Sequence, residues 1–190
     1  MYVTERPNDV MAIDAKTGKL FWLYRYNNSP DARVCCGANN RGVAMLGDTL
    51  YIGTLDAHLV AIDAKSGRPL WNVAVGDPKL GYSVTMAPLV AKGKVLVGVS
   101  GGEFGVRGWL KALDAKTGKV AWTGYTAGPD KDVLIGTRFK PFYGQDRGQD
   151  LGVKSWPPDA WKIGGGGAWA WISYDPELNL IYYGTANPGP

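Results

Sequence analysis

The only two cysteines of the 190-residue chain, Cys35 and Cys36, are adjacent, in the stretch RVCCGANNRG. Metal sites usually separate two cysteines by at least two residues, so that both sulfurs reach one ion. Structural disulfides usually join Cα atoms about 4.4–6.8 Å apart, whereas neighbouring Cα atoms lie about 3.8 Å apart. A bond between them would be a strained ring that closes no loop and adds little through chain entropy. Two interpretations stay open: two free, semi-buried thiols, or a rigid apolar disulfide plate beside a ligand.

Three other stretches carry side chains suited to holding a ligand. Glu103 lies among glycines in SGGEFGVRG, Trp169 follows four glycines in GGGGAWAW, and Asn187 lies in the turn-like GTANPGP. Each stretch alone is typical of ordinary turns. These stretches supply an acidic group, an amide oxygen and a large aromatic ring. Together with a disulfide plate, they would suit a flat ligand held with a hard cation.

Other catalytic motifs find little support. The single histidine, His58, falls in the alternating stretch DAHLV and is interpreted as a structural strand residue. The stretch GVSGG matches G-x-S-x-G, but the following EFGVRGW contains two glycines and is a poor helix, which that motif requires. No H-E-x-x-H, C-x-x-C or Walker pattern occurs. The sequence therefore does not favour a nucleophilic triad or a phosphate-binding loop.

Composition excludes two broad classes of protein. The net charge of +4 is spread along the chain without a run of lysine and arginine, which argues against nucleic-acid binding. No apolar stretch approaches 18 residues, so we expect no membrane span. The first residues, MYVTERPNDV, lack the features of a signal peptide and read as a strand already under way. We expect the chain to be a fragment of a longer protein.

An internal repeat indicates the elements that must position these residues. The pattern A-[IL]-D-A-K-[TS]-G-x-x-x-W occurs at 12–22, 61–71 and 112–122, at spacings of 49 and 51 residues. Each copy predicts a β-hairpin, because its aspartate can accept turn N–H groups and its glycine can adopt the left-handed conformation. The tryptophan that recurs once per copy is expected to pack between neighbouring units.

The spacing of the repeat predicts the fold class. Short alternating strands such as LYIGTL and KVLVGV precede the later hairpins, giving four antiparallel strands per unit of about 50 residues, as in a β-propeller blade. We predict an all-β propeller of about three and a half such blades. The predicted segments are a partial blade at 1–26, blades at 41–75 and 82–125, a long loop at 128–163 and a partial blade at 164–190.

Together these motifs resemble one family. The tryptophan repeats, the adjacent cysteines, SGGEFGVRG, WKIGGG, YDPELNLIYYGT and NPGP resemble the pyrroloquinoline quinone (PQQ) dependent alcohol dehydrogenases of the methanol and ethanol type. The match runs through essentially the whole chain in the same order. The resemblance implies an eight-bladed propeller, oxidation of a primary alcohol by hydride transfer to metal-bound PQQ, a periplasmic location and a cytochrome c electron acceptor.

The resemblance also implies how the cofactor is held. Cys35 and Cys36 match a disulfide that lies against one face of the quinone, and Trp169 matches the tryptophan on the other face. Arg41 matches an arginine that pairs with a cofactor carboxylate. Four further residues match hydroxyl or backbone contacts to the cofactor: Thr85, Ser100, Gly101 and Gly102.

The metal and the catalytic base are implied in the same way. Glu103 and Asn187 match ligands of a calcium or lanthanide ion that acts as a Lewis acid. Gly167 stands where many relatives carry threonine or serine, so one cofactor hydrogen bond of the family is not expected here. The family's catalytic aspartate falls beyond Pro190, so we expect the 190-residue chain alone not to oxidise alcohols.

Two alternatives to an alcohol dehydrogenase remain. A non-catalytic propeller scaffold, like the outer-membrane assembly lipoproteins, would share the tryptophan repeats, and a sugar-oxidising relative would share the propeller. The cysteine pair, Glu103, Trp169 and Asn187 favour the dehydrogenase, because a scaffold needs none of them. The adjacent cysteines favour the alcohol branch over the sugar branch.

Overall fold

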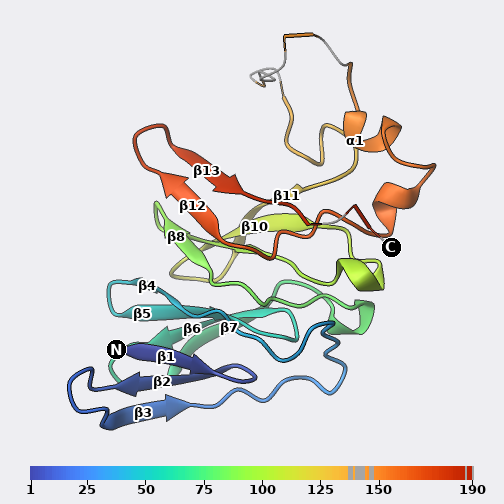
Figure 1. The fold of residues 1–190 in the computed structure, drawn as a ribbon. Helices are drawn as coiled ribbons and strands as arrows, with labels where there is room; N and C mark the ends of the chain where they lie inside the picture. Colours follow the sequence, from blue (N-terminus) through green and yellow to red (C-terminus); the bar gives the residue numbers. More distant parts are fainter. Residues whose placement is uncertain (137–138, 140–143, 146–147, 187, 190) are drawn as a thin grey trace.

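The computed structural model describes residues 1–136, 139, 144–145, 148–186 and 188–189, and its architecture is all-β (Figure 1). The strands form separate antiparallel sheets in which sequence neighbours pair. The first sheet contains β1 (Tyr2–Glu5), β2 (Asp9–Ile13) and β3 (Leu20–Tyr24). The second contains β4 (Ala44–Leu46), β5 (Thr49–Gly53), β6 (His58–Asp63) and β7 (Pro69–Ala74).

The remaining sheets follow the same order. The third sheet contains β8 (Leu89–Ala91), β9 (Lys94–Gly98), β10 (Trp109–Asp114) and β11 (Val120–Tyr125). The last sheet contains β12 (Ile172–Asp175) and β13 (Leu180–Tyr183). The described helices are short: η1 (Pro78–Leu80), η2 (Gly102–Phe104), α1 (Leu151–Lys154) and η3 (Ala160–Lys162). Four-stranded antiparallel sheets, as predicted from the repeat, are confirmed. A search of the described segments finds no helical stretch with the length and hydropathy of a transmembrane span.

The core lies between consecutive sheets, which stack one upon the next (Figure 1). Leu50, Ile52, Val60 and Ile62 pack with Val10 from the first sheet, and all five are fully buried. A larger cluster joins the other face of the second sheet to the third sheet. The central strands are therefore buried on both faces, which explains why β5 and β6 are continuous apolar runs instead of alternating ones.

The tryptophans of the first two repeats dock the first and second sheets on the hairpin of the next sheet. Trp22 Nε1 donates to the carbonyl of Ala64 at 3.1 Å, and Trp71 Nε1 donates to the carbonyl of Ala115 at 3.3 Å. Each indole also covers the hairpin glycine, because a Cβ built on Gly118 would lie 3.0 Å from the ring of Trp71. The expected packing role is confirmed for Trp22 and Trp71, and the glycine is required both for its positive φ and for this close approach.

We expect Trp71→Ala to lower the free energy of unfolding by about 3 kcal/mol, since it removes a packed aromatic ring and leaves the Ala115 carbonyl with one donor fewer. Trp122 is the matched control, because it occupies the same repeat position but is 36% exposed. Trp122→Ala should cost much less. Urea unfolding of both variants tests this, and equal losses would contradict interlocking of the sheets through the tryptophan.

The hairpin aspartates should make stability depend on acid pH. A backbone N–H of Thr17 holds the pKa of Asp14 below its ordinary value of 3.8, and hydroxyl groups of Ser66 and Thr117 do the same for Asp63 and Asp114. Because these carboxylates bind protons less readily folded than unfolded, their stabilisation is complete above about pH 4 and is lost as the pH falls through the folded-state pKa. A triple variant, with asparagine at all three positions, keeps an acceptor oxygen that does not titrate. Its thermal midpoint should fall less steeply below pH 4 than that of the wild type, and parallel curves would contradict the assignment.

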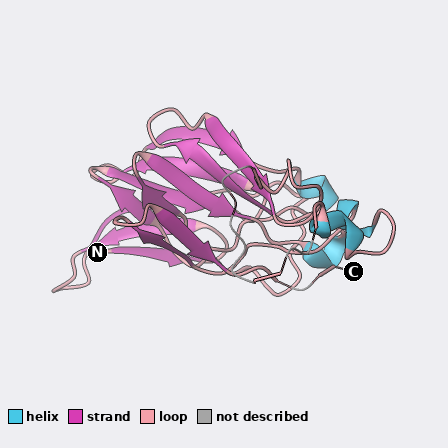
Figure 2. Ribbon diagram, turned by 90° about the horizontal axis from the view of Figure 1, so that it is seen from above, coloured by secondary structure: helices cyan, strands magenta, loops and turns pink. Residues whose placement is uncertain are grey.

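The connections that carry the candidate site residues lie at one end of the stacked sheets. In antiparallel sheets with this order, the β1–β2, β5–β6 and β9–β10 turns lie at the same end as the β3–β4, β7–β8 and β11–β12 connections. Figure 2 shows the strands on one side of the molecule and the short helices with these connections on the other. The cysteines, Glu103 and Trp169 all belong to this end.

Candidate functional site

Nine of the ten residues singled out in the sequence line one cavity of about 330 Å³. They come from four connections that are far apart in the chain but lie at the same end of the sheets. The nine residues are Cys35, Cys36, Arg41, Thr85, Ser100, Gly101, Gly102, Glu103 and Trp169. The tenth, Asn187, lies outside the described residues.

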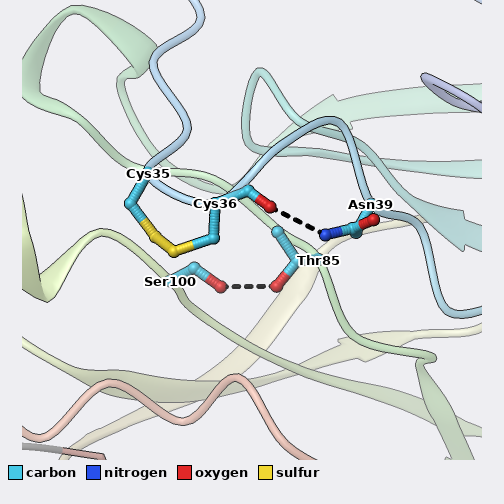
Figure 3. The surroundings of a disulfide bond; sticks show 5 residues. All are labelled: Cys35, Cys36, Asn39, Thr85 and Ser100. Atoms are coloured by element: carbon cyan, nitrogen blue, oxygen red, sulfur yellow. Dashed lines mark hydrogen bonds between the residues drawn. A yellow bond between two sulfur atoms is a disulfide. The ribbon is translucent and has the colours of Figure 1, made fainter.

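The cysteines form a disulfide bond with each other, across a Cα–Cα distance of 3.8 Å (Figure 3). This confirms the pairing that the family resemblance implied, and not the free thiols. The peptide of Cys36 is fixed from the side, because Asn39 Nδ2 donates to its carbonyl at 2.9 Å. Arg6 Nη2 donates in turn to Asn39 Oδ1 at 3.0 Å. The disulfide is solvent-exposed and forms an apolar part of the cavity wall.

Two hydroxyl groups lie close together in the same wall. Thr85 and Ser100 are hydrogen-bonded through their hydroxyl oxygens at 2.7 Å (Figure 3). Ser100 is held by an isolated bridge to Ser83, in which Ser100 N donates to the Ser83 carbonyl at 2.8 Å. A bridge of this kind fixes the backbone, so both hydroxyl groups have defined positions for a ligand with polar edges.

Arg41 and Trp169 form a third part of the site. The Arg41 guanidinium lies 5.4 Å from the centroid of the Trp169 ring, and its Nη1 donates to the Thr85 carbonyl at 2.9 Å. The indole of Trp169 is 42% exposed, an unusual amount for so large an apolar ring. A planar cavity wall with an adjacent cation suits an aromatic, negatively charged ligand.

The glycine run before Trp169 is explained by close backbone contacts. Gly165 and Gly166 have φ values of 85° and 68°, and Gly108 N donates to the Gly165 carbonyl at 2.8 Å. Thr126 Oγ1 donates to the Gly166 carbonyl at 2.6 Å. The run therefore bends tightly against the third sheet and presents Trp169 to the cavity.

Glu103 lies on η2 between two glycines in left-handed conformations, Gly101 with φ of 116° and Gly105 with φ of 81°. A side chain at Gly101 would overlap the carbonyl oxygen of Gly81, so this turn is closed to larger residues. Glu103 is exposed and has no hydrogen bond or ion pair within the described part of the chain. Its carboxylate is thus available to a cation or a polar ligand.

The charges of the cavity wall are few and of opposite sign. Among the described lining residues, Arg41 is the one cation and Glu103 the one anion. In the described segments, no three histidine, cysteine, aspartate or glutamate side chains lie so that they could hold a metal ion together. A metal bound here would therefore need oxygen ligands beyond Glu103, such as an amide, a carbonyl or the ligand itself, which fits a hard cation held jointly with an oxygen-rich ligand.

Sequence reasoning missed two polar residues of the wall, Ser83 and Asn39. Ser83 is buried and lies two residues before Thr85, so alternation along an extended segment could have placed both on one side. Asn39 carried no comparable signal, because its role depends on the conformation of the connection that contains the disulfide.

Comparisons with known proteins identify a family that matches the whole chain. The profile of the family described as "PQQ: Glucose/ethanol/alcohol dehydrogenase, beta-propeller domain" matches residues 1–190. The chain is 46% identical to the lanthanide-dependent methanol dehydrogenase of Methylacidiphilum fumariolicum, over all of this chain and 32% of that protein. It is also 46% identical to methanol dehydrogenase (cytochrome c) subunit 1 of Methylobacterium organophilum, with the same shares covered.

A solved structure gives the same result for the fold. A europium-containing methanol dehydrogenase superposes with a TM-score of 0.93 at 45% identity, over all of this chain and 34% of that one. The chain thus spans about a third of the length of the relatives it matches. Since the family profile covers every residue, the chain belongs to the PQQ family of glucose, ethanol and alcohol dehydrogenase β-propeller domains.

Proposed function

We propose that this segment provides the cofactor- and metal-binding part of a PQQ-dependent alcohol dehydrogenase that oxidises primary alcohols of the methanol or ethanol type. The observation that carries the proposal is the convergence of four separate connections on one cavity. Its wall contains a vicinal disulfide, an exposed indole, an arginine and a carboxylate that has no partner among the described residues. Bound PQQ supplies the two-electron oxidant for the alcohol, with a calcium or lanthanide ion as Lewis acid.

Each residue has a proposed task towards that cofactor. The Cys35–Cys36 disulfide and the Trp169 indole hold a flat ring system through apolar contact and exclude water from it. Arg41 binds a carboxylate, and its present hydrogen bond to the Thr85 carbonyl keeps it at the edge of the cavity. The hydroxyl groups of Thr85 and Ser100 and the backbone of Gly101 and Gly102 orient the polar edges of the ring.

Glu103 is proposed to bind the metal, together with Asn187. Glu103 has no partner among the described residues and lies in a glycine-lined turn, so it has no evident packing role there, and carboxylate oxygens are preferred ligands of calcium. The aspartate that accepts the alcohol proton is proposed to come from a later part of a longer protein. By similarity to the relatives, we also propose a periplasmic location and a cytochrome c electron acceptor.

Reconstitution tests this function. Full-length protein carrying this segment should bind PQQ in the presence of calcium or a lanthanide, and this binding should quench its tryptophan fluorescence. With methanol or ethanol as substrate, the loaded protein should reduce an artificial electron acceptor. Glucose in place of the alcohol tests the sugar-oxidising alternative. A folded protein that binds no PQQ with either metal would instead support the non-catalytic scaffold.

A further inference from the structure

Buried polar side chains gather beneath the connection that carries the disulfide. In the described part of the chain, four polar residues are almost fully buried: Asn8, Thr54, Asp56 and Ser83. Ser83 belongs to the cavity wall. The other three lie in the β1–β2 and β5–β6 turns, and two of them, Asn8 and Asp56, contact residues of the β3–β4 connection, residues 25–43.

The β3–β4 connection has no regular structure to define its shape. It contains no strand or helix, yet it supplies Cys35, Cys36, Asn39 and Arg41 to the cavity. Long irregular connections usually serve a site, and their conformation must be set by contacts to the scaffold. The position of the disulfide therefore depends on whatever holds this connection in place.

Asp56 makes the most extensive of these contacts. Its side chain is 3% exposed, and Oδ1 accepts a hydrogen bond from Thr54 Oγ1 at 2.5 Å. Oδ2 accepts hydrogen bonds from Ser29 N at 2.9 Å and from Tyr26 OH at 3.2 Å. Asp56 thus joins the second sheet to the start of the β3–β4 connection through two donors. Burial raises the pKa of Tyr26 to about 12, so this hydroxyl remains a donor at neutral pH.

A second set of polar contacts holds the same connection near both of its ends. The buried amide of Asn8 contacts the amides of Asn28 at 2.5 Å and Asn40 at 3.1 Å, one on each side of the cysteines. Asn40 Nδ2 also donates to the Gly53 carbonyl at 2.8 Å. The connection is therefore linked to the first sheet through Asn8 on both sides of the cysteines. Asn40 links it to the second sheet as well.

We propose that Asp56 is a positioning residue for the site: its buried carboxylate fixes the β3–β4 connection, so that the Cys35–Cys36 disulfide stands ready in the cavity wall before the ligand arrives. The gain is pre-organisation, because a connection that is already ordered does not lose conformational freedom on binding. Asp56 lines no part of the cavity, so it acts through the connection and not by touching the ligand. For its effect on PQQ, this inference rests on the proposed function.

The test compares Asp56→Ala and Asp56→Asn in full-length protein carrying this segment. Asp48→Ala is the matched control, since Asp48 is an exposed aspartate in the β4–β5 turn, at the other end of the same sheet. In Asp56→Ala, backbone amides at 26–41 should exchange hydrogen at least about tenfold faster, and the Kd for PQQ should rise about tenfold or more, as for hydrogen bonds to a buried charge. Asp56→Asn keeps one acceptor oxygen, so its exchange rates and its Kd should lie between those of the wild type and Asp56→Ala. Asp48→Ala should match the wild type in both measurements.

Two results would overturn the proposal. One is an unchanged Kd together with unchanged exchange at 26–41. The other is faster exchange in β5 and β6 as well, with a lower thermal midpoint but a wild-type Kd at low temperature, which would make Asp56 only a stabiliser of the sheet. Should Asp56→Ala not fold, Tyr26→Phe removes a single donor and is judged by the same two measurements. Failure of the wild type to bind PQQ would contradict the proposed function, while the exchange measurement would still decide the role of Asp56.

Discussion

Replacing Glu103 with alanine is expected to abolish metal-dependent alcohol oxidation by full-length protein carrying this segment, with the sheets still folded. The carboxylate lines the cavity from a three-residue helix between glycines and makes no hydrogen bond or ion pair with the described residues. Its removal therefore leaves no buried partner unsatisfied, and stability should hardly change. Changes in residues that merely orient metal ligands already weaken metal binding by about 10- to 100-fold, so loss of a ligand should cost at least that much.

Two matched variants make this test specific. Glu103→Gln keeps the size of the side chain but removes its charge, and it should retain only part of the metal affinity. Glu177→Ala removes an exposed glutamate from the distant β12–β13 turn and should leave metal content and activity unchanged. Metal content by mass spectrometry and dye-linked activity are measured on the same samples. Wild-type metal content and activity in Glu103→Ala would rule out Glu103 as a ligand.

The fold could be predicted because its signals are local and repeated. The hairpin aspartate, the left-handed glycine and the tryptophan recur at fixed offsets. In each hairpin of the structure, the aspartate accepts a hydrogen bond from a backbone N–H of its own turn, and the glycine has a positive φ. The docking of Trp71 on the Ala115 carbonyl joins residues of different repeats. It was still predictable in outline, because a large aromatic residue once per unit needs a partner surface outside its own hairpin.

The site was predictable as a set of residues but not as a geometry. Nine residues could be named because they stand in motifs that resemble those of one family. The contacts that hold them could not be named, because buried polar partners such as Asp56 and Tyr26 come from different units and leave no periodic trace in the sequence.

The region predicted as a long loop shows the same limit. Among its described residues it contains α1 and η3, and it is fastened to the third sheet by Arg107. The Arg107 guanidinium lies 3.9 Å from the ring centroid of Tyr125 and 4.6 Å from that of Trp161. Its Nη2 donates to Asp132 Oδ2 at 2.9 Å. Nothing in the spacing of these four residues indicates that they meet.

The second large effect is expected when both cysteines are replaced by serine. The Cys35–Cys36 bond encloses almost no chain, so its removal should change the free energy of unfolding by only about 1 kcal/mol. Binding should suffer far more, because two hydroxyl groups that prefer water would replace an apolar plate in the cavity wall. The loss of apolar contact with a flat ligand corresponds to a roughly ten- to hundredfold rise in the Kd for PQQ.

This prediction distinguishes a disulfide that contributes to ligand binding from one that stabilises the fold. Thermal unfolding and PQQ titration are carried out on the Cys35→Ser, Cys36→Ser double variant and on wild-type protein, and intact-mass measurement with alkylation reports the thiol state. The wild type should take up no alkyl group before reduction and two after it. A large drop in the thermal midpoint with an unchanged Kd would mean that the bond serves stability alone. Two free thiols in cofactor-loaded wild-type protein would mean that the ligand does not need the bond. Neither result is expected, because the disulfide lies in the cavity wall, where a ligand would contact it, and closes no loop of the chain.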